Sequence, residues 1–302
     1  MATRYILYNP KAGATIDCQK LIALVEDPNK ESKLLDVTQI QDYQAFFANL
    51  ASEDDIVLCG GDGTLNRFVN NIDGVTITNE LLYYPSGTGN DFANDLEKAK
   101  DCQPFSISAY INDLPTVTVK GKTSRFVNGI GYGIDGYCCE VGDQLKKKNK
   151  KVNYTAIALK GLFGGYHTTG ATVTVDGVSH EYKKVWMVPT MHGRYFGGGM
   201  MPAPNQDRCG EEKTLSVMVV HDSPRLKTLI IFPTIFQGKH IKHTDIVDVF
   251  TGHEISVTFD RPTALQVDGE TVLAVTSYNA KSAGAAAKKQ EQVIEEKETV
   301  LL

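Results

Sequence analysis

Long apolar runs are missing from this chain of 302 residues, and so is the pattern of a secretory signal peptide. The longest apolar runs, such as Leu215–Val220 and Leu229–Phe232, are far too short to cross a bilayer, which takes about 20 residues. Near the start, Arg4 and Asn9 flank only a few apolar residues, too few for the core of a signal peptide. We therefore expect a cytoplasmic protein whose contact with membranes is peripheral.

Cysteine is scarce, and basic charge is not in excess. The six cysteines include no CxxC pair, and the adjacent Cys138 and Cys139 are badly placed to ligate one zinc ion. We interpret all six as reduced thiols of a cytosolic protein. The net charge of −5 argues against a general nucleic-acid-binding protein, so we expect no nucleic acid partner. A hydrophobic content of 42% is enough for a packed core.

A glycine-rich turn carries the clearest chemical signal. Gly60–Thr64 (GGDGT) follows the apolar run Asp55–Cys59, and apolar residues from Leu65 to Ile72 recur at helical spacing. A strand–turn–helix of this kind presents bare backbone N–H groups at the positive end of the helix, where phosphate binds. Asp62 adds a carboxylate that can hold Mg²⁺ or polarise a hydroxyl. The usual P-loop pattern, GxxxxGKS/T, is absent, so any nucleotide is held in another way.

The first 110 residues or so alternate between strand and helix patterns. Apolar runs such as Tyr5–Tyr8 and Leu81–Tyr84 predict strands, with helical spacing between them. This alternation is typical of a parallel sheet covered by helices on both faces, which binds ligands at the carboxyl ends of its strands. The loops at 9–13, 60–66 and 86–91 each follow a strand, so we expect them to meet at one edge of the sheet.

From about residue 115 the pattern changes to short strands, with one helix predicted over Tyr154–Leu162 and a strong hairpin turn at Asp176-Gly177. This half is typical of an antiparallel β-sandwich. We divide the chain into an α/β nucleotide-binding domain over residues 1–118, a β-sandwich over 119–278 and a tail over 279–302. The tail is rich in Ala, Lys, Glu and Gln, which leaves open a frayed end or a helix, and such a helix can pack back on the first domain.

Three motifs together resemble a known family. Asn9–Gly13 (NPKAG), Gly60–Asn66 (GGDGTLN) and Pro85–Phe92 (PSGTGNDF) look like the diacylglycerol kinase catalytic domain in order and spacing. More specifically, the chain resembles the bacterial soluble lipid kinases of that superfamily, which also includes sphingosine kinases.

The resemblance covers roughly residues 4–278. In the second half, Asn128–Asp135 (NGIGYGID), Gly197–Met200 (GGGM) and Val267–Glu270 (VDGE) look like signatures of the same family. A GGDGT turn alone would be shared with NAD kinases. The SGTGND segment and the late DGE shift the balance toward lipid kinases.

The resemblance implies a fold and a set of roles. It implies an N-terminal domain like that of NAD kinase and a C-terminal β-sandwich, with ATP between them. It also implies that Glu270 accepts the proton of the lipid hydroxyl; Asp62, the other candidate base, more plausibly serves Mg²⁺ and the phosphates. Phosphoryl transfer needs positioning, charge neutralisation by Mg²⁺ and a carboxylate near the attacking oxygen. The implied ATP contacts are Asn9, Pro10, Lys11, Ala12, Gly13, Thr38, Gly60, Gly61, Asp62, Gly63, Thr64, Leu65, Asn66 and Thr88.

One loop departs from the family's pattern. Members with a structural Mg²⁺ near the sandwich usually carry Asp-Gly shortly before a strand, whereas Pro204–Leu215 of this chain contains no Asp-Gly. Asp207 and Glu212 offer the hard oxygen ligands that Mg²⁺ takes, and we name both as candidate ligands.

The densest basic run is Lys146–Lys151 (KKKNKK). Each lysine near an anionic leaflet contributes about 1 kcal/mol to membrane binding. Leu162 and Phe163 follow closely and can dip into lipid. A solvated loop is the alternative interpretation, but an enzyme whose substrate lies in a bilayer needs a docking surface, and this run is the best candidate for it.

These observations predict an ATP-dependent lipid kinase that transfers the γ-phosphate of ATP to the hydroxyl of diacylglycerol or a related membrane lipid. One alternative is NAD-kinase-like phosphorylation of a soluble acceptor. Another is a catalytically weak regulator that binds nucleotide or lipid, which the altered loop at 204–215 favours. The sequence names neither the acceptor lipid nor the oligomeric state, monomer or homodimer.

Overall fold

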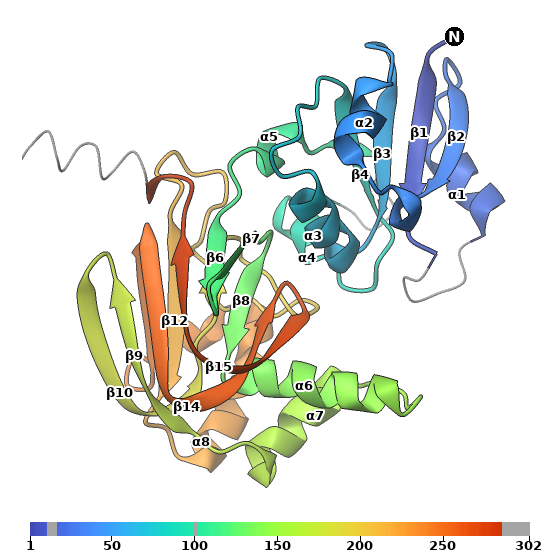
Figure 1. Cartoon of the computed structure of the whole chain (residues 1–302). Coiled ribbons are helices and arrows are strands. Elements are labelled where there is room, and N and C mark those ends of the chain that lie inside the picture. Colours follow the sequence, from blue (N-terminus) through green and yellow to red (C-terminus); the bar gives the residue numbers. More distant parts are fainter. Residues whose placement is uncertain (11–16, 99–101, 286–302) are drawn as a thin grey trace, which may run out of the picture. The chain divides into compact units, whose positions relative to one another are not determined.

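The computed structural model describes residues 1–10, 17–98 and 102–285, and it divides the chain into two compact units, Met1–Asp113 and Leu114–Leu302 (Figure 1). The predicted boundary at 118/119 falls inside strand β6 (Thr116–Val119). Lys11, Ala12 and Gly13 of the expected ATP-binding loop lie outside the described residues, as does the tail from 286 onward.

The first unit contains a five-stranded sheet in the order β2-β1-β3-β4-β5. The first four strands in this order run parallel, and β5 pairs with β4 in antiparallel fashion. The predicted alternation of strand and helix is therefore confirmed. The strands are β1 (Thr3–Tyr8), β2 (Glu31–Asp36), β3 (Asp55–Gly60), β4 (Glu80–Pro85) and β5 (Phe105–Ser106).

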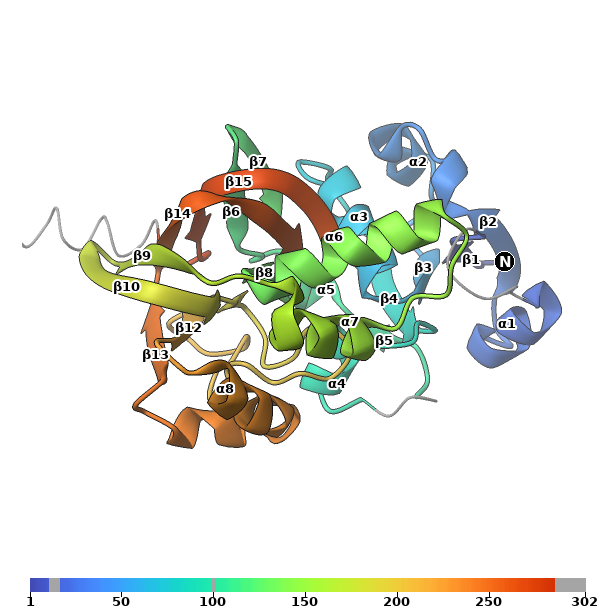
Figure 2. The same ribbon diagram turned by 90° about the horizontal axis from the view of Figure 1, so that it is seen from below.

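Helices connect these strands and cover the sheet. All six residues of β3 are buried, because a central parallel strand is covered on both faces. Figure 2 shows α1 on one side of the sheet and α2 and α3 on the other. In α3 the buried residues include Leu65, Phe68 and Val69, the face that the spacing predicts. The helices are α1 (Cys18–Val25), η1 (Val37–Gln39), α2 (Tyr43–Ala48), α3 (Asp62–Asn71), α4 (Asp91–Asp95) and α5 (Ser108–Ile111).

The second unit contains a ten-stranded antiparallel sheet, which confirms the predicted β-rich half. Strand β9 pairs with both β10 and β14, so the sheet curls back on itself around an apolar core that includes Val173, Val217 and Val257. The predicted turn at Asp176-Gly177 joins β9 to β10. The strands after β6 are β7 (Lys122–Arg125), β8 (Gly129–Tyr132), β9 (Thr169–Val175), β10 (Val178–Met187), β11 (Thr190–Met191), β12 (Leu215–His221), β13 (Val247–Gly252), β14 (Glu254–Val267) and β15 (Glu270–Lys281).

Several helices pack on this sheet around a second apolar core that includes Trp186, Met218 and Ile235. The predicted helix over Tyr154–Leu162 is present as α7 (Tyr154–Lys160), which continues into a π-helical turn, η2 (Gly161–Gly165). The other helices are α6 (Ile134–Lys147), α8 (Arg225–Ile231), η3 (Phe232–Gln237) and η4 (Lys239–Lys242). Within residues 1–10, 17–98 and 102–285, no helix has both the length and the hydropathy of a membrane span.

Candidate active site

The carboxyl ends of the four parallel strands carry the predicted ATP-binding residues of the described chain. Thr38 follows β2, Asn9 follows β1, and Gly61–Asn66 and Thr88 follow β3 and β4. The strand ends are level, because Tyr8 pairs with both Asp36 and Cys59 and Gly60 pairs with Pro85. The expectation that these loops meet at one edge of the sheet is confirmed for the described residues.

The two glycine turns of this edge touch each other through their backbones. A Cβ added to Gly87 would lie 2.4 Å from the Cα of Gly61, so only glycine fits there. The backbone N–H of Ser86 donates to the carbonyl of Gly60 at 3.0 Å, and the buried hydroxyl of Tyr83 donates to the same carbonyl at 2.8 Å. The GGDGT and SGTGND segments therefore form one structure, although Thr64, which ends the first, and Ser86, which begins the second, are 22 positions apart.

Asn90 fixes the shape of the second turn. Its backbone is left-handed, with φ of 54°, a conformation that Asn tolerates better than most residues. Its side-chain oxygen accepts from the N–H of Gly87 at 3.0 Å, and its side-chain nitrogen donates to the carbonyl of Gly87 at 3.0 Å. This reciprocal pair holds the turn closed beside Gly61.

Asp62 joins the two turns. Its carboxylate oxygens accept from the backbone N–H groups of Asp91 at 3.0 Å and Phe92 at 2.9 Å. These are the first residues of α4, whose own N-cap residue, Asn90, supplies no side-chain capping bond. Asp62 thus caps α4 from 29 residues away, a structural role that the sequence did not indicate. Whether it also holds Mg²⁺ and phosphate stays a prediction.

The first turn of α3 suits a phosphate group. Its N-cap is Gly61, which supplies no side-chain hydrogen bond. A Cβ added to Gly63 would meet nothing within 4 Å, so packing within the chain does not require glycine at that position. The backbone at Gly63 is therefore not covered by other parts of the chain, and it lies at a helix N-terminus, where anions bind. Mg²⁺ commonly takes one or two carboxylates together with phosphate oxygens, and Asp62 offers one such carboxylate at this turn.

In the second unit, Asp268 organises the DGE turn. Asp268 and Gly269 have φ of 45° and 88°, which makes a tight turn between β14 and β15. The Asp268 carboxylate accepts three consecutive backbone N–H groups at the start of β8, those of Val127 at 2.5 Å, Asn128 at 2.8 Å and Gly129 at 2.9 Å. This carboxylate fastens β8 to the turn.

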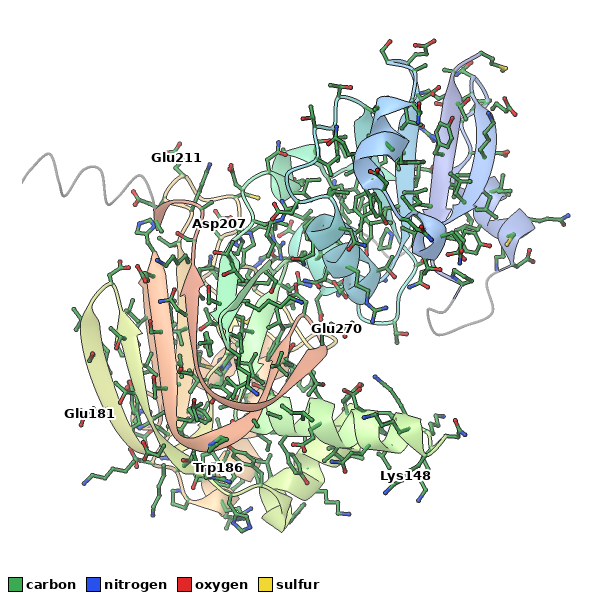
Figure 3. The ribbon with its side chains drawn as sticks, in the orientation of Figure 1. Lys148, Glu181, Trp186, Asp207, Glu211 and Glu270 are labelled. Carbon is green, nitrogen blue, oxygen red and sulfur yellow. The ribbon has the colours of Figure 1, made fainter. Side chains whose placement is uncertain are left out.

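Glu270, the predicted base, is the first residue of β15 and is exposed. Figure 3 shows it at the tip of the β14–β15 turn. The neighbouring side chains fix this turn, because the N–H of Gly269 donates to the buried Gln266 at 2.6 Å and Thr271 donates to Asp143 of α6 at 2.7 Å. Glu270 therefore stands on a well-anchored turn. Its role as base stays a prediction.

The loop at 204–215 contributes Arg208 to the same network. Its guanidinium donates to the carbonyl of Val127 at 3.2 Å and to the side-chain oxygen of Asn128 at 3.0 Å. Arg208 and Asp268 thus hold the same stretch of backbone. Sequence reasoning missed Arg208, and its spacing of 80 residues from Asn128 gave no signal of the contact.

The candidate metal ligands lie in this loop as well. Asp207 accepts from the N–H of Cys209 at 2.8 Å, which makes a local turn, and Glu212 is exposed. Figure 3 marks Asp207 and the neighbouring Glu211. Over the described ranges, no group of three or more His, Cys, Asp or Glu side chains is arranged to hold a metal ion. Mg²⁺ binding by Asp207 and Glu212 stays a prediction.

Gly131, Gly133 and Gly136 have the GxGxxG spacing of a dinucleotide turn and lie in β8, at the junction and in the first turn of α6, respectively. Here the glycines serve close packing. A Cβ at Gly136 would lie 1.9 Å from the carbonyl oxygen of Ala264, and one at Gly133 would lie 2.6 Å from that of Trp186. Since protein backbone fills these positions, we assign no nucleotide to this turn.

Comparison with known proteins defines the class to which these two units belong. Residues 3–119 match the diacylglycerol kinase catalytic domain, and residues 128–283 match the YegS C-terminal NAD kinase beta sandwich-like domain. The chain therefore belongs to the diacylglycerol kinase catalytic-domain superfamily, in its family of lipid kinases with a NAD-kinase-like β-sandwich.

Individual relatives are bacterial. The chain is 24% identical over 244 residues to the Bacillus subtilis protein named "Putative lipid kinase YtlR", covering 75% of this chain and 77% of that protein. It is 23% identical over 201 residues to a diacylglycerol kinase of Mycobacterium tuberculosis, covering 64% of this chain and 63% of that protein, so the match spans less than two thirds of that relative. A crystal structure of a diacylglycerol kinase from Bacillus anthracis has the same fold, with a TM-score of 0.62, 22% identity and coverage of 93% and 95%.

Proposed function

We propose that this protein transfers the γ-phosphate of ATP to the hydroxyl of diacylglycerol or a related lipid. The contact between the GGDGT and SGTGND turns at the carboxyl edge of the first sheet carries this proposal, because it creates an open, glycine-lined helix N-terminus beside a fixed carboxylate. Membership of a lipid kinase family supports a phosphotransferase and directs the choice of acceptor.

The first unit would hold the nucleotide. The backbone of Gly61–Gly63 at the start of α3 would donate to the phosphates, and Asn9, Thr38 and Thr88 would surround them from the neighbouring strand ends. Mg²⁺, when bound at Asp62, would neutralise phosphate charge. Asp62 keeps the two turns together as well, so its side chain would serve both the fold and the nucleotide.

The second unit would supply the base. Glu270 is an exposed carboxylate on a turn that Asp268 anchors, and a carboxylate within reach of a hydroxyl can act as a general base. In this role Glu270 takes the proton of the lipid hydroxyl as the hydroxyl oxygen attacks the γ-phosphorus, and ADP leaves.

Transfer of label from γ-labelled ATP to vesicles that contain diacylglycerol tests this proposal. We would compare the wild type with Glu270→Gln and Asp62→Asn. The asparagine retains one oxygen for the cap of α4, which alanine would remove. Glu181→Gln is the matched control, because Glu181 is an exposed carboxylate on β10 (Figure 3).

We expect wild-type transfer, a loss of about 10²-fold or more for Glu270→Gln, a loss for Asp62→Asn and unchanged transfer for Glu181→Gln. Transfer to NAD⁺ and to none of several lipids would contradict the proposed acceptor. Full activity of Glu270→Gln would remove it as the base.

A further inference from the structure

Exposed apolar side chains gather at one end of the second unit. The described residues expose eleven large apolar side chains, and six of them come from α7–η2 and α8–η3. Leu159 and Phe163 lie one helical turn apart with exposures of 38% and 71%, and Leu226 and Ile230 do so with 70% and 69%. We call these four residues the apolar face. Figures 1 and 2 agree in placing α7 and α8 at the same end of the unit.

Arg225 ties the two halves of the apolar face together. Its guanidinium donates to the carbonyls of Leu162 at 2.7 Å and Gly161 at 3.4 Å and lies 5.1 Å from the centre of the Trp186 ring. Arg225 therefore supplies hydrogen-bond donors to two carbonyls of η2, the turn that carries Phe163. A turn that enters a bilayer requires this, since lipid offers no hydrogen bonds.

The two chain segments that carry the apolar face are rich in basic residues. Residues 144–165 contain six lysines and no Asp or Glu, and residues 223–243 contain three lysines, Arg225 and no Asp or Glu. The chain as a whole carries −5, so the positive charge is concentrated here. Lys148 lies at the free end of α6 in Figure 3 and is exposed. At the edge, Asp143 pairs with Lys146 at 3.2 Å and Asp245 pairs with Lys227.

A small apolar cavity of about 20 Å³ lies within the second unit. Leu162 and Ile231 line it, whereas their neighbours Phe163 and Ile230 are exposed, so each pair has one side chain inside the unit and one at its surface.

We propose that the apolar face docks on an anionic bilayer, with Phe163 and Ile230 inserted among the acyl chains and the lysines of 146–151 on the lipid headgroups. Exposed apolar residues in lysine-rich segments that contain no acidic residue are typical of an interfacial membrane contact. The proposal rests on the proposed function in that it explains how a lipid kinase would reach its acceptor, and it extends the predicted role of Lys146–Lys151 to a defined surface.

Vesicle sedimentation without ATP tests the docking. Phosphatidylcholine vesicles are compared with vesicles that also contain phosphatidylglycerol. We expect the wild type to prefer the anionic vesicles, and the double variant Phe163→Gln/Ile230→Gln to bind them about a hundredfold more weakly, since burying each side chain is worth about tenfold. Val178→Gln is the control, because Val178 is 61% exposed on the β9–β10 hairpin and lies outside the apolar face.

A variant with fewer lysines separates the electrostatic contribution to vesicle binding from the apolar one. Lys146→Gln/Lys147→Gln/Lys148→Gln should lose most of the preference for phosphatidylglycerol while retaining the effect of Phe163 and Ile230. Equal binding of wild type and double variant, or no preference for anionic vesicles, would overturn the docking proposal. Wild-type transfer to short-chain diacylglycerol in detergent micelles needs no docking, so its absence would count against the kinase and not against the apolar face.

Discussion

At the scale of single residues, Asp62 and Asn90 shape the candidate nucleotide site more than any apolar side chain does. Asp62 accepts two backbone N–H groups of α4, and Asn90 closes its own turn on Gly87. Asp62 thus joins backbone groups of two separate loops, and Asn90 fixes the shape of one of these loops. The carboxylate proposed to hold Mg²⁺ is therefore also the group that positions the neighbouring turn.

Two glycines of this surface should respond differently to alanine. Gly63→Ala meets open space and should leave the free energy of unfolding unchanged or raise it by up to about 1 kcal/mol, while weakening ATP binding. Gly87→Ala forces Cβ against the Cα of Gly61 and should cost about 1–3 kcal/mol. Urea unfolding and calorimetric ATP titration check both. A Gly63→Ala protein with unchanged ATP affinity would show that phosphate does not approach this turn.

Asp135 should make stability depend on pH. Burial raises the pKa of Asp135 to about 7, and its Oδ2 atom has no hydrogen-bond partner among the described residues. Because the folded-state pKa exceeds the usual value, the folded state keeps a proton that the unfolded state releases, and stability is lost as pH rises through about 7.

Asp135→Asn should flatten this dependence. Between about pH 5 and about pH 8 the wild type should lose roughly 2–3 kcal/mol that the variant retains. Urea unfolding at the two pH values measures the difference. Parallel losses in both proteins would mean that Asp135 is ionised in the folded state.

At the scale of secondary-structure elements, the parallel sheet could be predicted because each strand is a short apolar run and each following helix has a buried face. The end of each strand then located Asn9, Gly61 and Thr88 on one edge, whereas Thr38 was named only through the family resemblance. Helix α8 could not be predicted in this way. It buries Ile231 while exposing Leu226 and Ile230, so its apolar residues do not mark one face.

Contacts between elements far apart in the chain also could not be predicted from the sequence. The hydrogen bonds of Arg208 to Asn128 and of Asp62 to α4 join residues 80 and 29 positions apart, and no local pattern encodes them. Helix α6 did leave a signal, since Ile134, Cys138 and Val141 recur at helical spacing and pack into the second core.

The hydrogen bonds between Asp268 of the DGE turn and the start of β8 give a prediction at this scale. Asp268→Ala removes the acceptor of three backbone N–H groups and should lower the free energy of unfolding by about 2–4 kcal/mol. Glu181→Ala, at an exposed position, should change it by less than about 0.5 kcal/mol. Urea unfolding of both variants measures these changes. Similar stabilities of the two variants would show that the hydrogen bonds of Asp268 contribute little to the free energy of unfolding.

At the scale of the whole molecule, the net charge of the chain and the charge of the segments that carry the apolar face have opposite signs. The chain is acidic, yet the segments that carry the apolar face are rich in basic residues. Binding to anionic vesicles should therefore weaken steeply as salt concentration rises, because the lysines are exposed and screened within a Debye length of about 8–10 Å. Sedimentation over a salt series measures this, and salt-independent binding would indicate that lysine plays no part.

The central claim is that this chain phosphorylates a membrane lipid. The most direct measurement presents wild-type protein, γ-labelled ATP and Mg²⁺ to a panel of vesicles that differ only in the hydroxyl lipid, with diacylglycerol among them, and separates the labelled lipids. We predict labelled phosphatidic acid from the diacylglycerol vesicles, or the phosphorylated form of a related lipid. Label that reaches no lipid in the panel, from protein that binds ATP, would contradict the claim.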